Sequence, residues 1–154
     1  MSGIVLVDAN AALKARIGQE WGEVAAHYTH LTDGFSLVAL AGDALAGLIA
    51  LQYRTLPAPW AATYEGFIDF IEVHPLYRRQ GIAAQLIMRA CERLHAQGIY
   101  QVRAWSSEDK TAAIQMWKRL GFTLCPATTY VREQSVPGYF VAKLLQPRHN
   151  GAHS

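Results

Sequence analysis

The stretch IEVHPLYRRQGIA, residues 71–83, decides the fold that we expect for this chain of 154 residues. An apolar strand ends at Val73, and Pro75 holds His74 in an extended conformation. A basic turn with one glycine, Gly81, then leads directly into a helix with one apolar face. This order of strand, turn and helix places unpaired backbone N–H groups at a helix N-terminus, where anions bind.

The turn at residues 78–81 has the chemistry of a phosphate site. Gly81 lets the backbone approach a phosphate closely, and Arg78 and Arg79 add fixed positive charge. The stretch has neither the Gly-x-Gly-x-x-Gly spacing nor the Gly-Lys-Ser/Thr ending of the Walker motif, which argues against a dinucleotide-binding or P-loop fold. A pyrophosphate fits such a turn.

Composition predicts one folded domain over residues 1–146 and a polar, mobile tail over residues 147–154. Charged residues make up 17% of the chain and the net charge is only +2, which argues against bulk electrostatic binding to nucleic acid. The apolar run at residues 35–51 is interrupted by Gly42-Asp43, so we interpret it as two strands of a soluble hairpin rather than a membrane span.

The cysteines and histidines predict no metal site. Cys91 and Cys125 have no metal-ligand spacing, and among the six histidines only His27 and His30 stand close together. Two cysteines are also too few for a disulfide framework, so we expect reduced thiols in a cytoplasmic protein.

Hydrophobic periodicity predicts seven strands and helices between them. We expect strands at 4–7, 35–41, 45–53, 66–73, 100–105, 122–125 and 139–144, and helices at 13–28 with a break near Gly18 or Gly22, at 81–97 and at 109–120. Ser106 or Ser107 is expected to cap the last helix. Strands alternate with helices from residue 66 to 125, which predicts an α/β or α+β fold with a mixed sheet.

These residues resemble the GNAT superfamily of acyl-CoA-dependent N-acetyltransferases. Its signature, Gln/Arg-x-x-Gly-x-Gly/Ala after a strand, is matched by Arg78, Gly81 and Ala83. The lead-in Val-x-Pro-x-Tyr-Arg at residues 73–78 and the Leu-Gly-Phe at residues 120–122 also match, so the resemblance covers about residues 35–125.

The resemblance implies a mixed, mostly antiparallel sheet flanked by helices, in which two central parallel strands, 66–73 and 100–105, splay apart. It implies acetyl-CoA as co-substrate, with the pantetheine arm pairing with the backbone between these strands as an added strand does. The pyrophosphate would lie on the amides of residues 79–84, and a bulge is expected between Asp69 and Glu72. The cofactor-binding residues implied are Ile71, Val73, Arg78, Arg79, Gln80, Gly81, Ile82, Ala83, Ala84, Lys110, Ala113 and Trp117.

The resemblance further implies direct attack of a neutral primary amine on the thioester. The amine must lose a proton, the oxyanion needs a donor and the leaving thiolate takes up a proton. Asp69 stands where family members often carry a Glu that deprotonates the amine directly or through water, and Glu72 is the alternative; the backbone N–H of Val73 can serve the oxyanion. Strand alternation puts Asp69 and Glu72 on opposite faces unless the bulge intervenes.

The chain departs from the family at the residue that would protonate the leaving thiolate. Trp117 stands where a Tyr commonly acts as the acid, and Lys110 replaces a common Asn. Indole N–H donates a hydrogen bond but no proton, so either water protonates the thiolate or Tyr130 or Tyr139 reaches in. We expect Trp117 to pack beside the pantetheine or the acceptor.

Trp21, Trp60 and Tyr64 are the candidate substrate-binding residues. An aromatic loop over residues 54–64 could close over a compact acceptor, which favours a small-molecule amine over a protein or peptide amine. The alternative class is a non-catalytic acyl-CoA-binding or sensor module, which the replacements at Trp117 and Lys110 support. We expect no nucleic-acid or membrane partner, and edge strands with exposed aromatics favour a homodimer.

Overall fold

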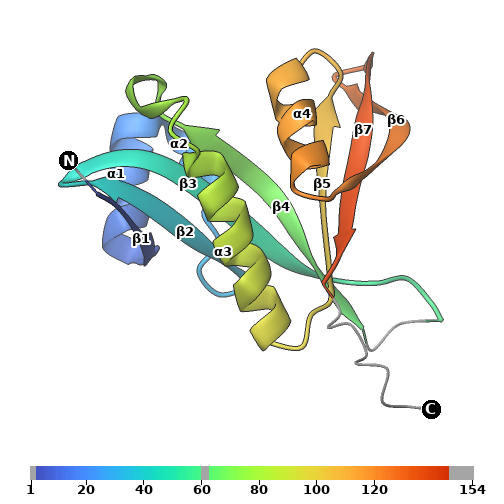
Figure 1. The fold of residues 1–154 in the computed structure, drawn as a ribbon, viewed down its shortest axis with the longest axis horizontal. Coiled ribbons are helices and arrows are strands. Elements are labelled where there is room, and N and C mark those ends of the chain that lie inside the picture. Colours follow the sequence, from blue (N-terminus) through green and yellow to red (C-terminus); the bar gives the residue numbers. More distant parts are fainter. Residues whose placement is uncertain (1–2, 60–62, 146–154) are drawn as a thin grey trace.

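The computed structural model describes residues 3–59 and 63–145. Within these ranges one seven-stranded sheet has the order β1-β2-β3-β4-β5-β7-β6. The elements are β1 (Ile4–Asp8), α1 (Ala11–Trp21), α2 (Glu23–Tyr28), β2 (Gly34–Ala41), β3 (Ala44–Thr55), β4 (Tyr64–Val73), the short 3-10 helix η1 (Pro75–Tyr77), α3 (Ile82–Ala96), β5 (Gln101–Ser107), α4 (Thr111–Arg119), β6 (Thr123–Val131) and β7 (Gln134–Leu144). In Figure 1, α3 and α4 lie in front of the sheet and α1 and α2 lie behind it.

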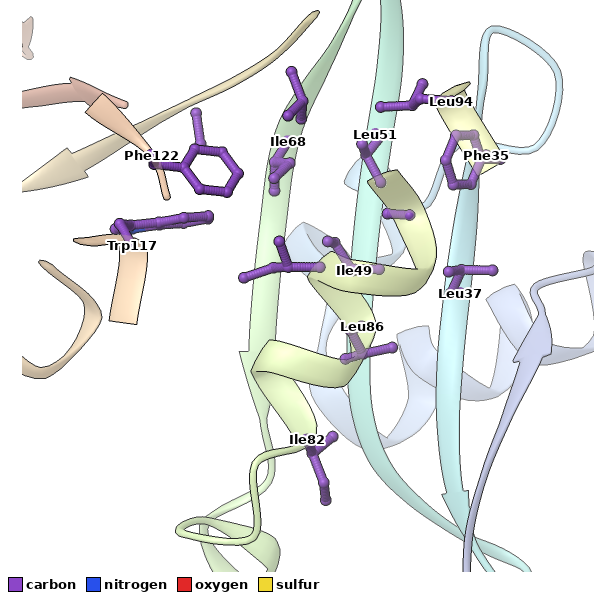
Figure 2. Packing of buried hydrophobic residues seen from close by; sticks show 14 of the residues in the cluster. Phe35, Leu37, Ile49, Leu51, Ile68, Ile82, Leu86, Leu94, Trp117 and Phe122 are labelled. Carbon is purple, nitrogen blue, oxygen red and sulfur yellow. The ribbon is translucent and has the colours of Figure 1, made fainter. Parts of the chain in front are cut away.

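Each face of the sheet has its own apolar cluster. The front cluster joins the buried face of α3 to β2, β3 and β4, and it extends to Trp117 of α4 and to Phe122 (Figure 2). The back cluster joins Ile17 of α1 and Ala25 of α2 to Val38 and Leu48 of the sheet. The cluster to which a side chain belongs therefore shows on which face of the sheet that side chain lies.

The two cysteines are free. Cys91 packs against the front cluster, and burial raises the pKa of its thiol to about 11. The thiol therefore stays protonated at neutral pH and is no nucleophile.

Strands β4 and β5 are paired over a very short distance. Their parallel register consists of Gly66 with Val102, Phe67 with Arg103 and Ile68 with Ala104. Past Ile68 the strands part, and Figure 1 shows β4 and β5 diverging toward the end of the sheet that carries the start of α3. The predicted splayed pair in a mostly antiparallel sheet is confirmed.

A β-bulge lies where the two strands part. On β3, Ala50 pairs with Phe70 while the next residue, Leu51, pairs with Ile68, so Asp69 is the extra residue of β4. A bulge bends its strand and increases the local twist. The expected bulge between Asp69 and Glu72 is thereby located at Asp69.

The helices follow the predicted pattern, including the break near Gly22, and differ from it at the cap of α4. The first helical region consists of α1 and α2, broken at Gly22, which has a φ of 100° that favours glycine. The predicted serine cap of α4 is wrong, because Ser106 is buried inside β5 and Lys110 takes the cap position. Ser107 instead donates its hydroxyl to the carboxylate of Asp109.

The last two strands are longer than predicted. β6 and β7 form one hairpin that continues past the end of β5, where Ser107 pairs with Gly138. Its turn uses Arg132 and Glu133 at φ values of 49° and 67°, without the Asn-Gly signal of such turns. In the described part of the chain, no helix is long and apolar enough to cross a membrane.

Candidate active site

The turn before α3 presents a row of unpaired backbone amides. Gly81 caps the helix at a φ of 75°, and Arg79 has a φ of 67°. Among the hydrogen bonds of the described residues none uses the N–H groups of residues 79–84, and Gln85 is the first to donate back, to the carbonyl of Gly81 at 3.0 Å. Successive free amides at the positive end of a helix form an anion-binding concavity.

The residues of this turn differ in exposure along its length. Arg78, Arg79 and Gln80 are exposed, while Ile82 is buried in the front cluster and Ala83 and Ala84 are half-buried. Arg78 donates from Nε to the carbonyl of Val73 at 3.1 Å, which ties the turn to the end of β4. Arg78 therefore has a structural contact in addition to the charge that it brings to the turn.

Backbone groups of β4 point into the gap between β4 and β5. His74 donates its N–H to the carbonyl of Ala46 at 2.8 Å, and the next pair along the ladder is Val73 with Gly47. Hydrogen-bonded and non-bonded pairs alternate in an antiparallel ladder, so Val73 and Ile71 belong to non-bonded pairs. Their N–H and C=O groups thus face away from β3, toward the side where β5 has diverged.

Helix α4 lines the other side of the gap. Lys110, Ala113 and Trp117 fall at i, i+3 and i+7 and share one face of the helix. Lys110 is exposed and Ala113 packs against the front cluster. Figure 2 shows the ring of Trp117 directed from α4 toward β4 and Ile68.

Trp117 belongs to the core and carries an unsatisfied donor. Its side chain is 3% exposed and packs edge to face on Phe122, with ring centroids 4.8 Å apart. Its indole Nε1 is buried and has no hydrogen-bond partner among the described residues, and the same is true of Trp105 on β5. A buried donor without a partner costs about 1–3 kcal/mol, so such a group favours a ligand that satisfies it.

These groups fit the pantetheine and pyrophosphate of acetyl-CoA. The free amides of residues 79–84 suit a diphosphate, and the N–H of Val73 with the outward-facing backbone of Ile71 suits an extended arm that contains amides. The unsatisfied Nε1 of Trp117 lies on the α4 side of the same gap.

The bulge turns both candidate carboxylates to the back of the sheet. Phe70 packs in the back cluster, whereas Ile71 and Val73 pack against the front cluster. Glu72 pairs with Leu48, a member of the back cluster, and so faces the same side. Asp69 also faces this side, where it contacts a residue after α2. The simple alternation that would separate Asp69 from Glu72 does not apply, because the bulge adds one residue between them.

Asp69 is part of a closed ring of five polar side chains. Its Oδ2 lies 2.7 Å from His30 Nε2, and its Oδ1 accepts a bond of 2.8 Å from Arg54. His30 Nδ1 lies 2.9 Å from Asp33 Oδ1, Gln52 donates to Asp33 Oδ2 at 3.1 Å, and Arg54 Nε donates to Gln52 at 3.1 Å. The hydrogen bond from Gln52 is the main reason why the pKa of Asp33 is lowered.

Glu72 differs from Asp69 in having no such partners. It is exposed, and no hydrogen bond or ion pair in the described part of the chain includes it. Sequence reasoning missed His30 and Arg54, because their partner Asp69 lies 39 and 15 positions away. The described residues also contain no group of three or more His, Cys, Asp or Glu side chains arranged to hold a metal ion.

The predicted substrate-binding aromatics do not come together. Trp21 lines a cavity of about 200 Å³ with His74 and Tyr77, at the end of β4 that carries the turn into α3. Tyr64 is 51% exposed and begins β4 at its other end, about 30 Å from Val73 at 3.3 Å per residue. Trp21 and Tyr64 therefore lie at opposite ends of β4, a role of Tyr64 in acceptor binding stays a prediction, and Trp60 lies outside the described residues.

The two tyrosines considered as acids are also separated. Tyr139 packs against the front cluster and so shares a face with Trp117. Tyr130 is exposed on the part of the β6–β7 hairpin that extends past β5. Of the two, Tyr139 lies on the side of α4.

The profile of the acetyltransferase (GNAT) family matches residues 8–122. The chain belongs to this family. The match begins at the end of β1 and ends after α4, so it includes the turn at Gly81, the bulge and Trp117.

This GNAT chain is similar to several named proteins. A curated relative, N-alpha-acetyltransferase 30 of Schizosaccharomyces pombe, is 27% identical over 96 residues, and the match spans 62% of this chain and 62% of the relative. The crystal structure of Arabidopsis thaliana NAA60 with acetyl-CoA has a TM-score of 0.78 at 16% identity and covers 92% of this chain and 99% of its own. The Escherichia coli ribosomal-protein-S18-alanine N-acetyltransferase has a TM-score of 0.73 at 15% identity, covering 99% and 100%. At such identities these structures establish the shared fold.

The two glycines at the ends of α3 test the anion turn. Gly81 and Gly98 have φ values of 75° and 77°, and a Cβ at either would meet nothing within 4 Å. Valine at either position should cost about 1–2 kcal/mol of stability because of the left-handed backbone. We expect Gly81→Val to weaken acetyl-CoA binding about 100-fold in calorimetry, an amount typical of losing several charge-assisted hydrogen bonds. Gly98→Val should bind like wild type, and equal losses in both variants would contradict the assignment.

The two unsatisfied indoles provide a second test. Phenylalanine at Trp117 or Trp105 removes a buried donor that has no partner, so neither change should lose the free energy of a hydrogen bond in the ligand-free protein. We expect Trp117→Phe to weaken acetyl-CoA binding about tenfold, the value of one hydrogen bond, while Trp105→Phe does not. Unchanged affinity in Trp117→Phe would show that Nε1 does not contact the ligand.

Proposed function

We propose that this GNAT chain transfers the acetyl group of acetyl-CoA to a primary amine by direct attack. The observation that carries the proposal is the row of free amides at residues 79–84, next to the free edge of β4 at Ile71 and Val73. A diphosphate on the first and an extended arm along the second would aim a thioester between β4 and β5. The acceptor then has to approach from the back of the sheet, because α3 and α4 cover the front.

The residues of the chain divide the chemistry between them. Acetyl-CoA, when bound, supplies the activated acetyl group as a thioester. The N–H of Val73 faces the gap and serves the oxyanion that forms on attack. Asp69, at the point of divergence, removes the proton from the acceptor ammonium directly or through water. The indole of Trp117 donates a hydrogen bond on the side of the leaving sulfur, and water protonates the thiolate.

An α-amine of a protein or peptide is the acceptor class that we propose to test first. The curated relative is an N-alpha-acetyltransferase, and one structural relative is a ribosomal-protein-S18-alanine N-acetyltransferase. The expectation of a small molecule depended on the aromatic loop before Tyr64, which starts β4 at the end away from Val73. A small-molecule amine remains the second candidate class, and the cytoplasmic location and the homodimer stay predictions from the sequence.

An acceptor panel tests the proposal. Free thiol released from acetyl-CoA is measured with peptides of varied first residue, the same peptides with blocked N-termini, and polyamines and other small primary amines. We expect release with free peptide α-amines and none with the blocked peptides. Release with small amines alone would move the acceptor to the second class. Tight acetyl-CoA binding without release for any amine would favour the non-catalytic binding module.

The two carboxylates on the back face should differ in their effect on turnover. Asp69→Asn keeps the size of the side chain but cannot take a proton, so we expect kcat to fall about 100-fold or more with unchanged acetyl-CoA affinity. Glu72→Gln should change kcat less than about threefold, because Glu72 is exposed and not oriented by any partner in the described ranges. A larger loss in Glu72→Gln than in Asp69→Asn would assign the base to Glu72.

A further inference from the structure

Three side chains on the back of the sheet form a line from the interior to the surface. The side chain of Asp69 is 9% exposed, that of His30 is 11% exposed and that of Asp33 is 56% exposed. His30 contacts one carboxylate with each ring nitrogen, Asp69 at 2.7 Å and Asp33 at 2.9 Å. The line starts where β4 leaves β5 and ends at the surface in the loop before β2.

The proposed reaction creates a need for such a path, so a relay here rests on the proposed function. An ammonium and a thioester give an amide, a thiol and one free proton. The ammonium loses its first proton to become a nucleophile. As the C–S bond breaks, water protonates the departing sulfur and takes the second N–H proton from the attacking nitrogen. The first proton must leave a nearly buried carboxylate in every turnover.

We propose that His30 carries this proton from Asp69 to Asp33 and so to solvent. A neutral His30 ring that donates from Nδ1 to Asp33 presents the lone pair of Nε2 to Asp69. Once Asp69 has taken the proton from the ammonium, Nε2 accepts that proton. The loaded ring then donates to both carboxylates, which lie within hydrogen-bond distance of its two nitrogens. Release of the Nδ1 proton to Asp33 completes the transfer, and a ring flip or exchange with water restores the first tautomer.

The surrounding contacts hold the three groups in line. Arg54 binds the second oxygen of Asp69 and lies 3.8 Å above the ring of Phe67, so Asp69 is fixed from the side opposite His30. Ser36 donates its hydroxyl to the backbone carbonyl of His30 at 2.9 Å, which anchors the loop to β2. The charged groups facing His30 in the described structure are Asp33 from its own loop and Asp69 from β4, with Arg54 of β3 behind Asp69.

Asp33 is suited to pass the proton on. Its pKa is lowered, first by the hydrogen bond from Gln52, and its side chain is more than half exposed. Because this carboxylate is exposed, a proton that reaches it passes directly to water. His30 itself acts through Asp69 and touches no substrate, so it is a positioning residue with a relay function.

Chemical rescue distinguishes the relay from a structural contact. His30→Ala removes the ring and leaves room for free imidazole, and His27→Ala is the matched control because His27 is exposed and has no hydrogen bond with a carboxylate in the described residues. We expect kcat of His30→Ala to fall about 100-fold while its acetyl-CoA affinity in calorimetry stays unchanged. Added imidazole should raise this reduced kcat about tenfold. The rescued rate should rise with the concentration of neutral imidazole. His27→Ala should match wild type with and without imidazole.

Asp33→Asn tests the outer end without removing a hydrogen-bond acceptor from His30. Its amide oxygen can still accept from Nδ1 but cannot take the proton, so we expect kcat to fall about tenfold and to recover with the concentration of a basic buffer. A wild-type kcat in either His30→Ala or Asp33→Asn would overturn the relay, and so would a loss in His30→Ala that imidazole does not change. If wild type itself neither binds acetyl-CoA nor releases thiol with any amine, the proposed function fails and the relay fails with it.

Discussion

The interruption of pairing between β4 and β5 is the constraint on which the rest of the structure depends. Three pairs hold the strands together, and the bulge at Asp69 then bends β4 away. Beyond this point backbone donors and acceptors of Ile71 and Val73 face a gap instead of a neighbouring strand. Unpaired backbone groups near a protein core are costly unless water or a ligand satisfies them. A sheet broken in this way is therefore arranged for an extended ligand rather than for maximal stability.

The same bulge separates two tasks between the two faces of the sheet. In front, the amides before α3 and the indole of Trp117 lie beside the gap and match the groups of acetyl-CoA. Behind, the extra residue turns Asp69 toward His30 and Arg54, so that a carboxylate near the gap is held in a fixed position. Cofactor and acceptor can then meet in the gap from opposite sides, and the proton has its own route away from the cofactor.

Local signals made much of this predictable from the sequence. The strand, proline, basic turn and Gly81 lie within thirteen consecutive residues, and their conformations follow from short-range rules. The long-range features were not predictable in the same way. His30 meets Asp69 across 39 positions only because α2 ends against β4, and the β6–β7 hairpin turns on Arg132 and Glu133, which carry no turn signal. The position of Tyr64 was likewise not predictable, because a loop that is near β4 in sequence joins the strand at the end away from the gap.

Backbone amide resonances of the protein report where acetyl-CoA lies. In a titration with acetyl-CoA followed by ¹⁵N–¹H correlation spectra, the account predicts the largest shifts at residues 79–84 and at Ile71 and Val73. The indole resonance of Trp117 should shift as well, while that of Trp105 should stay in place. Binding that leaves the amides of residues 79–84 unchanged, or that shifts residues of the β6–β7 hairpin instead, would contradict the account.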